Sequence, residues 1–190
     1  MVALAATADV EALLGRSLTP EESLRVDAIL VKASELFRLE ARQQFTPGTS
    51  TQRLRVIDGS AHLPQRPVVS VTTVQDDGGV DVAGWSLSGY RLIVPLESGS
   101  WANVTYDHGA SPVPDLVRTT VADVARKVLE IDPKAAQGVS QFGRTTGPFS
   151  DQLTYATWAQ GGQTMLAPDD RAIARSYRPA RSTPVLTGGY

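Results

Sequence analysis

The sequence changes its hydrophobic periodicity twice, and this change constrains the fold more than any other feature. Apolar residues recur at intervals of three and four along residues 20–44 and 114–131, as on one face of an amphipathic helix. Between them, residues 51–106 alternate apolar and polar positions in short runs separated by glycine and proline, which is typical of antiparallel strands. The sequence therefore predicts an α+β fold, mainly α: a bundle of about three to four helices with an inserted small antiparallel β-sheet.

Capping signals support the helix assignments. Thr19 and Glu22 have the spacing of a capping box, in which each side chain bonds the other residue's backbone amide. Pro114 suits the first position of a helix, where its missing N–H costs nothing. The predicted helices span residues 7–15, 20–44, 114–131 and 168–177.

These elements predict a single domain over residues 1–177. Residues 134–164 are rich in Gly, Gln, Ser and Thr, and we predict a mobile loop there with a weak strand at 153–155. Residues 178–190 contain prolines and glycines but no acidic residue, so they cannot bury much surface alone. We predict an extended C-terminal tail for them.

Composition excludes several classes of protein. The chain has 190 residues with 18 Lys+Arg and 20 Asp+Glu, so its net charge of −2 does not suit a surface built to neutralise phosphates. It has no cysteine, which excludes disulfides, thiolate zinc sites and cysteine nucleophiles. It shows neither a signal peptide nor a run of about 18 apolar residues, so we expect a soluble, intracellular protein.

Asp107 and His108 are the residues that most resemble an active site. They open three possibilities: a catalytic pair, a metal site or a corner in the backbone. The other histidine, His62, ends an apolar strand, and no His-x-x-x-His spacing is present, so zinc is not expected. Gly109 permits unusual backbone angles and Pro114 presets a helix start, so we interpret this stretch as a structural corner that Asp107 and His108 cap. No catalytic, cofactor-binding or metal-binding residue is predicted, and we do not expect an enzyme.

Four aromatic residues in the predicted sheet have two interpretations. They could stack on the bases of a single strand, which would make the chain a small nucleic-acid-binding module. That mode needs a basic groove, whereas the sheet offers only scattered arginines, so core or interface packing is the favoured interpretation. The aromatic residues are Trp85, Tyr90, Trp101 and Tyr106.

A series of short motifs resembles a known family. In order, they are Asp-Val-Glu-Ala-Leu-Leu-Gly-Arg at 9–16, Leu-Thr-Pro-Glu-Glu at 18–22, Leu-Pro-Gln-Arg-Pro-Val-Val-Ser-Val at 63–71, Val-Thr-Tyr-Asp-His-Gly at 104–109, Val-Pro-Asp at 113–115 before a valine-rich helix, and Leu-x-Pro-x-x-Arg at 166–171. Over residues 7–178 this order resembles the head-to-tail adaptor (connector) proteins of long-tailed bacteriophages, particularly those of actinobacteria.

The resemblance implies a structural role in the neck of the virion, after assembly in the host cytoplasm. Adaptors of this family form a twelve-fold ring under the portal protein, extend the DNA channel and dock the stopper or tail-completion protein. Genomic DNA would pass through without sequence-specific binding, and no cofactor is implied. A head-completion stopper or a tail-completion protein is the alternative of the same class.

Two groups of residues are candidates for these contacts. The polar faces of the long helices could pair across neighbouring copies, although each residue could equally belong to a solvated helix surface; they carry Arg25, Lys32, Glu35, Arg118, Asp123, Arg126 and Lys127. The C-terminal region could order on docking to the portal. It carries Arg171, Arg175, Tyr177, Arg178, Arg181, Val185, Leu186 and Tyr190.

Overall fold

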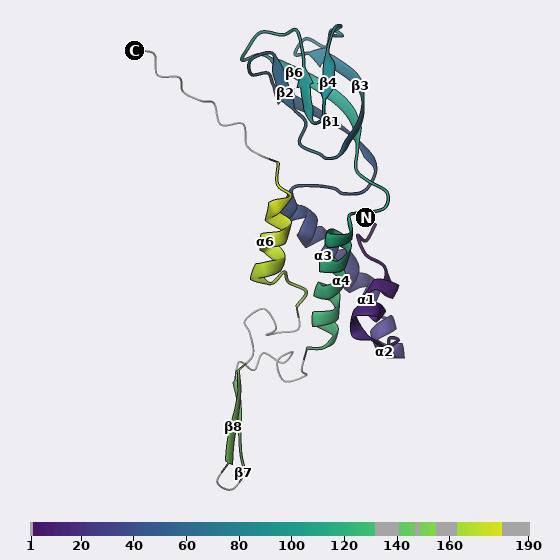
Figure 1. The fold of residues 1–190 in the computed structure, drawn as a ribbon, viewed down its shortest axis with the longest axis vertical. Helices are drawn as coiled ribbons and strands as arrows, with labels where there is room; N and C mark the ends of the chain where they lie inside the picture. Colours follow the sequence, from purple (N-terminus) through teal and green to yellow (C-terminus); the bar gives the residue numbers. More distant parts are fainter. Residues whose placement is uncertain (1, 132–140, 147–148, 155–162, 180–190) are drawn as a thin grey trace, which may run out of the picture. The chain divides into compact units, whose positions relative to one another are not determined.

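The computed structural model describes residues 2–131, 141–146, 149–154 and 163–179 (Figure 1). It divides into two compact units. The helical unit is built from Met1–Ala41 and Pro114–Ser176. The β-unit is built mainly from Arg42–Val113, so it is inserted between the two halves of the helical unit, and Tyr177 belongs to it as well.

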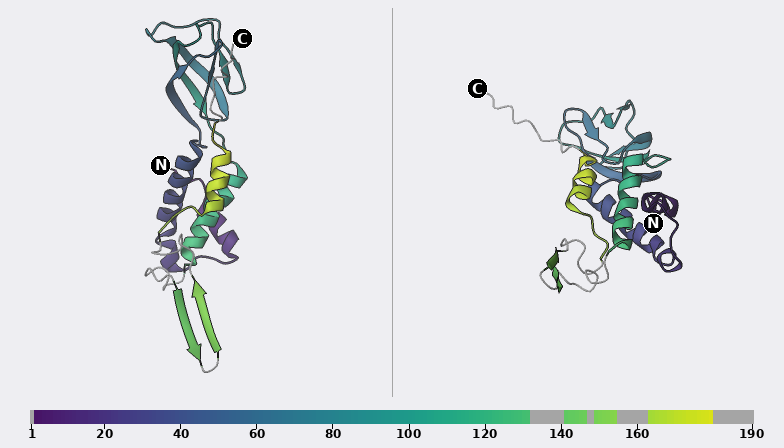
Figure 2. Two further views of the ribbon diagram at one scale, coloured as in Figure 1. Left: turned by 90° about the vertical axis from the view of Figure 1, so that its left-hand side faces the viewer. Right: turned by 60° about the horizontal axis from the view of Figure 1, so that its bottom comes forward.

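The helical unit is held together by apolar faces that meet. Helix α3 packs against α4 and α6, and α1 packs against α4, as the views in Figure 2 show. The valine stripe predicted from the sequence is the buried face of α4, where Val117 and Val121 are fully buried. The helices are α1 (Thr7–Leu14), α2 (Pro20–Ser23), α3 (Val26–Ala41), α4 (Asp115–Leu129) and α6 (Pro168–Ser176).

The capping box at the start of α2 is confirmed. Thr19 Oγ1 accepts a hydrogen bond from the Glu22 amide at 3.3 Å, and Glu22 Oε2 accepts one from the Thr19 amide at 2.8 Å. Both terminal nitrogens of the Arg16 guanidinium, Nη1 and Nη2, also donate to the Glu22 carboxylate at 2.8 Å. Hydrogen bonding to Arg16, followed by the bond from Thr19, lowers the pKa of Glu22 to about 2.

The single helix predicted over 20–44 is wrong in two respects. It is interrupted after α2, because the Arg25 amide bonds the Glu22 carbonyl three residues back in a tight turn at 3.1 Å. It also ends at Ala41 rather than near Gln44, since Arg42 adopts a left-handed φ of 56° that a right-handed helix cannot continue. The buried Gln43 side chain then donates to the Pro64 carbonyl at 2.6 Å and accepts from the Arg66 amide at 2.8 Å, which holds the chain to the β-unit.

Two three-stranded antiparallel sheets form the β-unit. The first has the order β1-β6-β3, with Gly48 opposite His108 and Arg55 opposite Trp101 in the register of β1 and β6. The second has the order β2-β5-β4, with His62 opposite Arg91. Their strands are β1 (Gly48–Arg55), β2 (Ser60–His62), β3 (Val68–Asp76), β4 (Ser86–Ser88), β5 (Arg91–Ile93) and β6 (Trp101–His108).

Alternate positions of β6 supply the centre of the β-unit's core. Ala102, Val104 and Tyr106 are fully buried and face a cluster of apolar residues from the other strands. The interpretation of core or interface packing is therefore confirmed, as core packing, for Tyr106, whereas Tyr90 and Trp101 remain 41% and 38% exposed.

The region predicted as a mobile loop, 134–164, contains two paired strands. Strands β7 (Gln141–Thr146) and β8 (Phe149–Thr154) form an antiparallel hairpin, and β8 includes part of the weak strand predicted at 153–155. The other parts of this region, 134–140, 147–148 and 155–162, lie outside the described residues, as does the tail from residue 180.

The predicted combination of helices with an inserted antiparallel β-element is confirmed. The predicted predominance of helix is not, because strands take up nearly as many described residues as helices do. The fold is a mixed α+β arrangement. None of the described helices is long and apolar enough to cross a membrane.

Replacing Tyr106 with phenylalanine tests the polar anchor of the β-unit. The Tyr106 hydroxyl accepts from the Gln65 amide at 3.1 Å and donates to Gln52 Oε1 at 3.3 Å. We expect Tyr106→Phe to destabilise the protein by about 1–3 kcal/mol in urea denaturation, since it leaves these groups unpaired. The exposed Tyr90→Phe is the matched control, and equal effects of the two changes would contradict the assignment.

Candidate functional site

The corner after β6 depends on a glycine that touches another part of the backbone. Gly109 has a φ of 96°, and a Cβ atom there would lie 2.1 Å from the Thr46 carbonyl oxygen and 2.7 Å from Pro47 N. The Gly109 amide donates to the Pro67 carbonyl at 2.9 Å, and the Ala110 amide donates to the Phe45 carbonyl at 3.1 Å. These contacts join the segment that leads into the β-unit to the segment that leads out of it.

The structure separates Asp107 from His108. Neighbouring residues of a strand point to opposite faces of the sheet, and the two side chains have different partners. Asp107 accepts hydrogen bonds from Thr49 Oγ1 at 2.5 Å and Ser70 Oγ at 2.9 Å, one from each flanking strand. These bonds, that from Thr49 first, hold the pKa of Asp107 below its usual range. Asp107 thus ties β1 and β3 to β6, as a structural corner requires.

His108 lies on the buried face. It is 4% exposed, its Nε2 is 2.8 Å from Ser50 Oγ, and its ring centroid is 5.6 Å from that of Tyr106. Its Nδ1 is buried and has no hydrogen-bond partner among the described residues. Burial lowers the pKa of His108, against the opposing effect of the Asp107 charge.

Pro114 lies directly before the helix and not at its first position, so the helix begins one residue later than predicted. It is the N-cap residue of α4, with φ −52° and ψ 135°, and the helix begins at Asp115. The Pro114 carbonyl accepts from the amides of Val117 and Arg118, both at 3.0 Å. The proline carbonyl therefore caps the helix from outside its first turn.

The charged residues of α4 that we considered for a ring interface are engaged within the chain. Arg118 binds Asp9 of α1 at 2.5 Å and Asp115 at 2.9 Å. These bonds, with the Asp115 hydrogen bond as the largest cause, raise the pKa of Arg118. Arg118 thus links α4 to α1.

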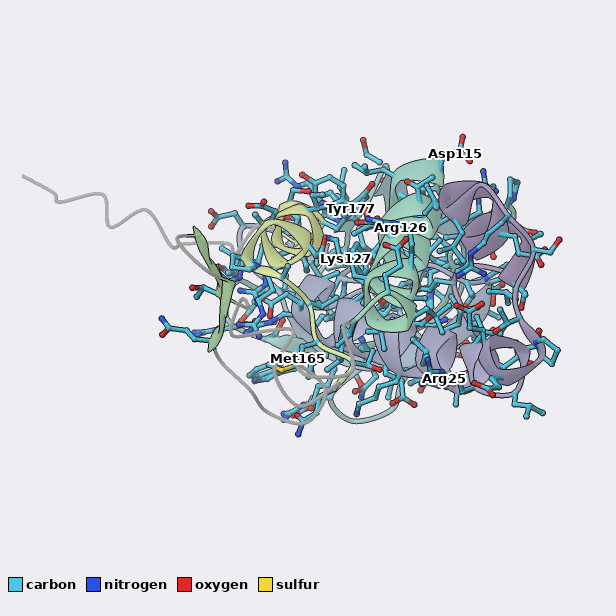
Figure 3. All side chains as sticks on the ribbon, turned by 90° about the horizontal axis from the view of Figure 1, so that it is seen from below. Arg25, Asp115, Arg126, Lys127, Met165 and Tyr177 are labelled. Atoms are coloured by element: carbon cyan, nitrogen blue, oxygen red, sulfur yellow. The ribbon has the colours of Figure 1, made fainter. Side chains whose placement is uncertain are left out.

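A second group of ion pairs links α4 to α6. Lys127 Nζ lies 2.8 Å from Asp123 and 3.2 Å from Asp170, which is 5% exposed and also accepts from the Ala167 amide. Burial alone would lower the pKa of Lys127, but the bond to Asp123 and the Asp170 charge outweigh it and raise the pKa. Arg126 binds Asp123 at 2.7 Å and Glu130 at 2.5 Å, and Figure 3 labels Arg126 and Lys127 on α4.

The other candidates for the ring lie just before α3 and within it: Arg25 precedes its first residue, and Lys32 and Glu35 belong to it. Arg25 and Lys32 are exposed and Glu35 is half-buried. Within the described residues, none of the three belongs to an ion pair. Two leucines of this segment are also exposed: Leu24, directly after α2, is 88% exposed, and Leu39, near the end of α3, is 75% exposed. Sequence analysis did not single out these leucines, because only the packing of the helices shows which apolar residues are left outside.

The candidates for portal binding lie at and beyond α6. Arg171 and Arg175 are exposed on α6, and Arg175 Nε binds Glu40 of α3 at 2.6 Å. Tyr177 meets Phe45 edge-on at 5.3 Å between ring centroids, and Arg178 is exposed. Arg181, Val185, Leu186 and Tyr190 lie outside the described residues.

The β-unit contains a surface cavity of 620 Å³. Arg55 and His62 contribute cationic and aromatic groups to its wall, beside two serines and two aliphatic side chains; the lining residues are Leu54, Arg55, Ile57, Ser60, His62, Ser98 and Gly99. Within the described part of the chain, no group of three or more His, Cys, Asp or Glu residues is placed to hold a metal ion.

Comparison with known proteins finds similarity in structure rather than in sequence. No protein-family model and no curated protein sequence matches the chain. A chain in the neck of an empty GTA (gene transfer agent) particle, computed with C6 symmetry, superposes with a TM-score of 0.54 over 93% of this chain and 90% of that one, at 17% identity. This chain shares the fold of that neck protein. A chain from the neck of a native GTA particle, computed with C12 symmetry, gives a TM-score of 0.49 over 96% of this chain and 97% of that one, at 16% identity.

Gly109→Ala tests the corner. The new methyl group would collide with the Thr46 carbonyl, and we expect a loss of about 3–5 kcal/mol in the free energy of unfolding. Gly79→Ala is the matched control, because Gly79 also has a positive φ, 81°, but a Cβ atom there would meet nothing within 4 Å. The control should cost only the backbone strain, about 1–2 kcal/mol. Equal losses would show that the close approach does not matter.

Burial of His108 predicts a loss of stability in mild acid. Its pKa is lower in the folded than in the unfolded chain, so its contribution is complete above about pH 6.5 and declines as pH falls toward the folded pKa. We expect up to about 1.4 kcal/mol lost per pH unit below about pH 6.5, measured by urea denaturation. His108→Gln should abolish this decline and the exposed His62→Gln should keep it. The reverse pattern would exclude His108 as the cause.

Proposed function

We propose that the protein is a structural subunit of a phage-type neck, a head-to-tail connector. The observation that carries this proposal is a fold shared with a neck protein over 93% of this chain and 90% of the other. A match of that extent takes in the helices before and after the β-unit and the inserted unit itself. The motif order along residues 7–178 independently resembles the adaptors of long-tailed phages, those of actinobacteria in particular.

In this role the chain forms a ring, twelve-fold as in the adaptor family, beneath the portal. A ring needs two different faces on each copy, which repetition closes. The segment from Leu24 to Leu39, which includes most of α3, is suited to one of them, since it exposes these two leucines together with Arg25 and Lys32. A contact between neighbouring copies would bury these leucines and pair the charges.

The ring would extend the DNA channel and offer a docking surface to the stopper or tail-completion protein. A net charge of −2 per copy favours a channel that DNA passes through without sequence-specific binding. Arg171 and Arg178, with the tail that follows, supply the contact with the portal. This role is structural: it requires no cofactor and no catalytic residue, and it places the protein in the virion neck after assembly in the host cytoplasm.

A stopper or tail-completion protein is the alternative of the same class, since it too is a small ring-forming protein of the neck. A nucleic-acid-binding module is the alternative of another class. It is less suited to this chain, because one of the two aromatic side chains of β6, Tyr106, is fully buried and cannot stack on a base.

Electron microscopy of the full-length protein with its portal-bearing capsids tests the proposal. We expect a ring of added density at the narrow end of the portal. Density that appears only when another neck protein is already bound would favour the stopper, and the absence of any ring would contradict a connector role. Salt-dependent binding of the isolated protein to DNA would instead support the nucleic-acid-binding alternative.

Deletion of residues 178–190 tests the portal contact. We expect the truncated protein to keep its unfolding midpoint and to lose portal binding, measured by co-sedimentation with capsids. A full-length variant with the same residues 178–190 in scrambled order is the matched control for charge and composition. Normal decoration of the portal by the truncated protein would show that the tail is not the contact.

A further inference from the structure

The β-unit holds one arginine firmly in place without a carboxylate partner among the described residues. The Arg66 guanidinium lies over the Tyr90 ring, with Cζ 3.5 Å from the ring centroid. The Arg66 amide is bonded to the buried Gln43 side chain at 2.8 Å, so the backbone beneath the guanidinium is anchored. Arg66 Nε is buried and has no hydrogen-bond partner in the part of the chain that the structure describes. An arginine stacked on an aromatic ring keeps the edge of its guanidinium free to bind a planar anion.

Other cationic and aromatic groups surround this arginine. The His62 ring lies 5.8 Å from the Tyr90 ring between centroids, and His62 is opposite Arg91 in the register of β2 and β5. We call His62, Arg66, Tyr90 and Arg91 the basic end of the second sheet. Neither Arg66 nor Arg91 forms an ion pair with an acidic residue of the described chain. Arg53, in the same unit, differs in this respect, since it binds Asp77 at 2.8 and 3.0 Å.

Two carboxylates lie past the opposite ends of the same strands. Asp58 is in the turn before β2 and Glu97 follows β5, and the Asp58 amide donates to Ser98 Oγ at 3.2 Å, which brings the two segments together. Both residues are exposed. Their carboxylates form no ion pair within the described residues. We call Asp58 and Glu97 the acidic end.

We propose that the basic end of one copy receives the acidic end of the next copy, so that β-units meet head to tail around the ring. The inference rests on the proposed ring and names one of its contacts. Two unpaired groups of opposite sign on one unit cannot satisfy each other when strand separates them; Arg91 lies opposite His62, whereas Asp58 lies in the turn beyond Ser60, at the other end of β2. A neighbouring copy satisfies both groups at once, and the same contact repeats until the ring closes.

A second copy fits the basic end better than a nucleic acid does. Binding to a DNA backbone needs several phosphate contacts along a basic surface. The β-unit instead combines its arginines with exposed acidic residues such as Asp58, Asp77 and Glu97. The acidic residues of such a mixed surface repel a polyanion such as DNA. A neighbouring copy instead presents its acidic end to the basic end of this one, so the charges of the two surfaces are complementary.

The absence of cysteine from the chain allows a direct test by disulfide trapping. We expect the double variant Asp58→Cys, Arg91→Cys to give a ladder of dimers, trimers and larger covalent oligomers after mild oxidation under assembly conditions. In one copy the rise from Ser60 to His62 alone is about 7 Å, and the turn that carries Asp58 lies beyond it, so the two residues are too far apart for an internal disulfide. Each single variant should stay monomeric on the same non-reducing gel, since a head-to-tail contact does not bring identical residues together.

Val69→Cys, Val80→Cys is the matched control pair. Val69 and Val80 belong to the same unit and are 66% and 65% exposed, but neither lies at the basic or the acidic end. We expect no ladder from them. A ladder as strong as that of the first pair, or none from the first pair, would overturn the inference.

Charge reversal provides a second test that needs no oxidation. We expect Arg91→Glu and Glu97→Arg each to raise the concentration needed for ring assembly by about tenfold, because attraction becomes repulsion. The double variant restores complementary ends and the native net charge, so it should assemble as the unchanged protein does. Failure of this rescue, or normal assembly of both single variants, would contradict the contact.

The outcomes separate this inference from the proposed function. Rings at the portal without a 58–91 ladder would refute the β-unit contact and leave the connector role intact. A protein that forms no ring with portal-bearing capsids, in the electron-microscopy test above, would refute the connector role itself. A ladder that stops at dimers would show a two-fold rather than a head-to-tail contact, and would also refute the inference.

Discussion

The approach of Gly109 to the backbone of Thr46 and Pro47 is the contact on which the β-unit depends. An inserted unit must begin and end at nearly the same place, since the chain on both sides of it belongs to another unit. Gly109 allows this because a Cβ there would lie 2.1 Å from the Thr46 carbonyl oxygen. The bond from the Ala110 amide to the Phe45 carbonyl completes the closure, and β1 and β6 then pair along their full lengths in the register that this closure sets.

The charges of the helical unit separate into those that are paired within the fold and those that are not. Arg118, Arg126 and Lys127 have carboxylate partners within the chain, and two of them connect different helices. Arg25, just before α3, and Lys32, on α3, have no such partner among the described residues. In the sequence all five look alike, as cations on the polar faces of amphipathic helices. Only the packing of helices distinguishes them, because an ion pair between residues 9 and 118 has no trace in local sequence.

The same distinction applies to the sites. Sequence reasoning interpreted the stretch around Asp107 as a corner, from the conformational freedom of Gly109 and the restraint of the prolines, and Gly109 has the positive φ on which that interpretation depends. It did not foresee that Asp107 would bridge three strands while His108 is buried on the other face. It also missed the stacking of Arg66 on Tyr90, because these residues are brought together by the pairing of short strands. Register between strands depends on the whole sheet, and a single strand does not encode it.

By itself, the sequence determined the order of helices and strands, the buried stripe of α4, the capping box at Thr19 and the corner at Gly109. These features follow from periodicity and local backbone preference, which act over a few residues. The tertiary structure alone decided where the helix after Thr19 breaks and ends, how much of the chain is strand, and which charges are paired inside the fold. It also decided that the basic and acidic ends of the second sheet remain unpaired among the described residues. Each of these depends on contacts between segments that are far apart in the sequence. Such contacts contribute to the free energy only in the folded chain.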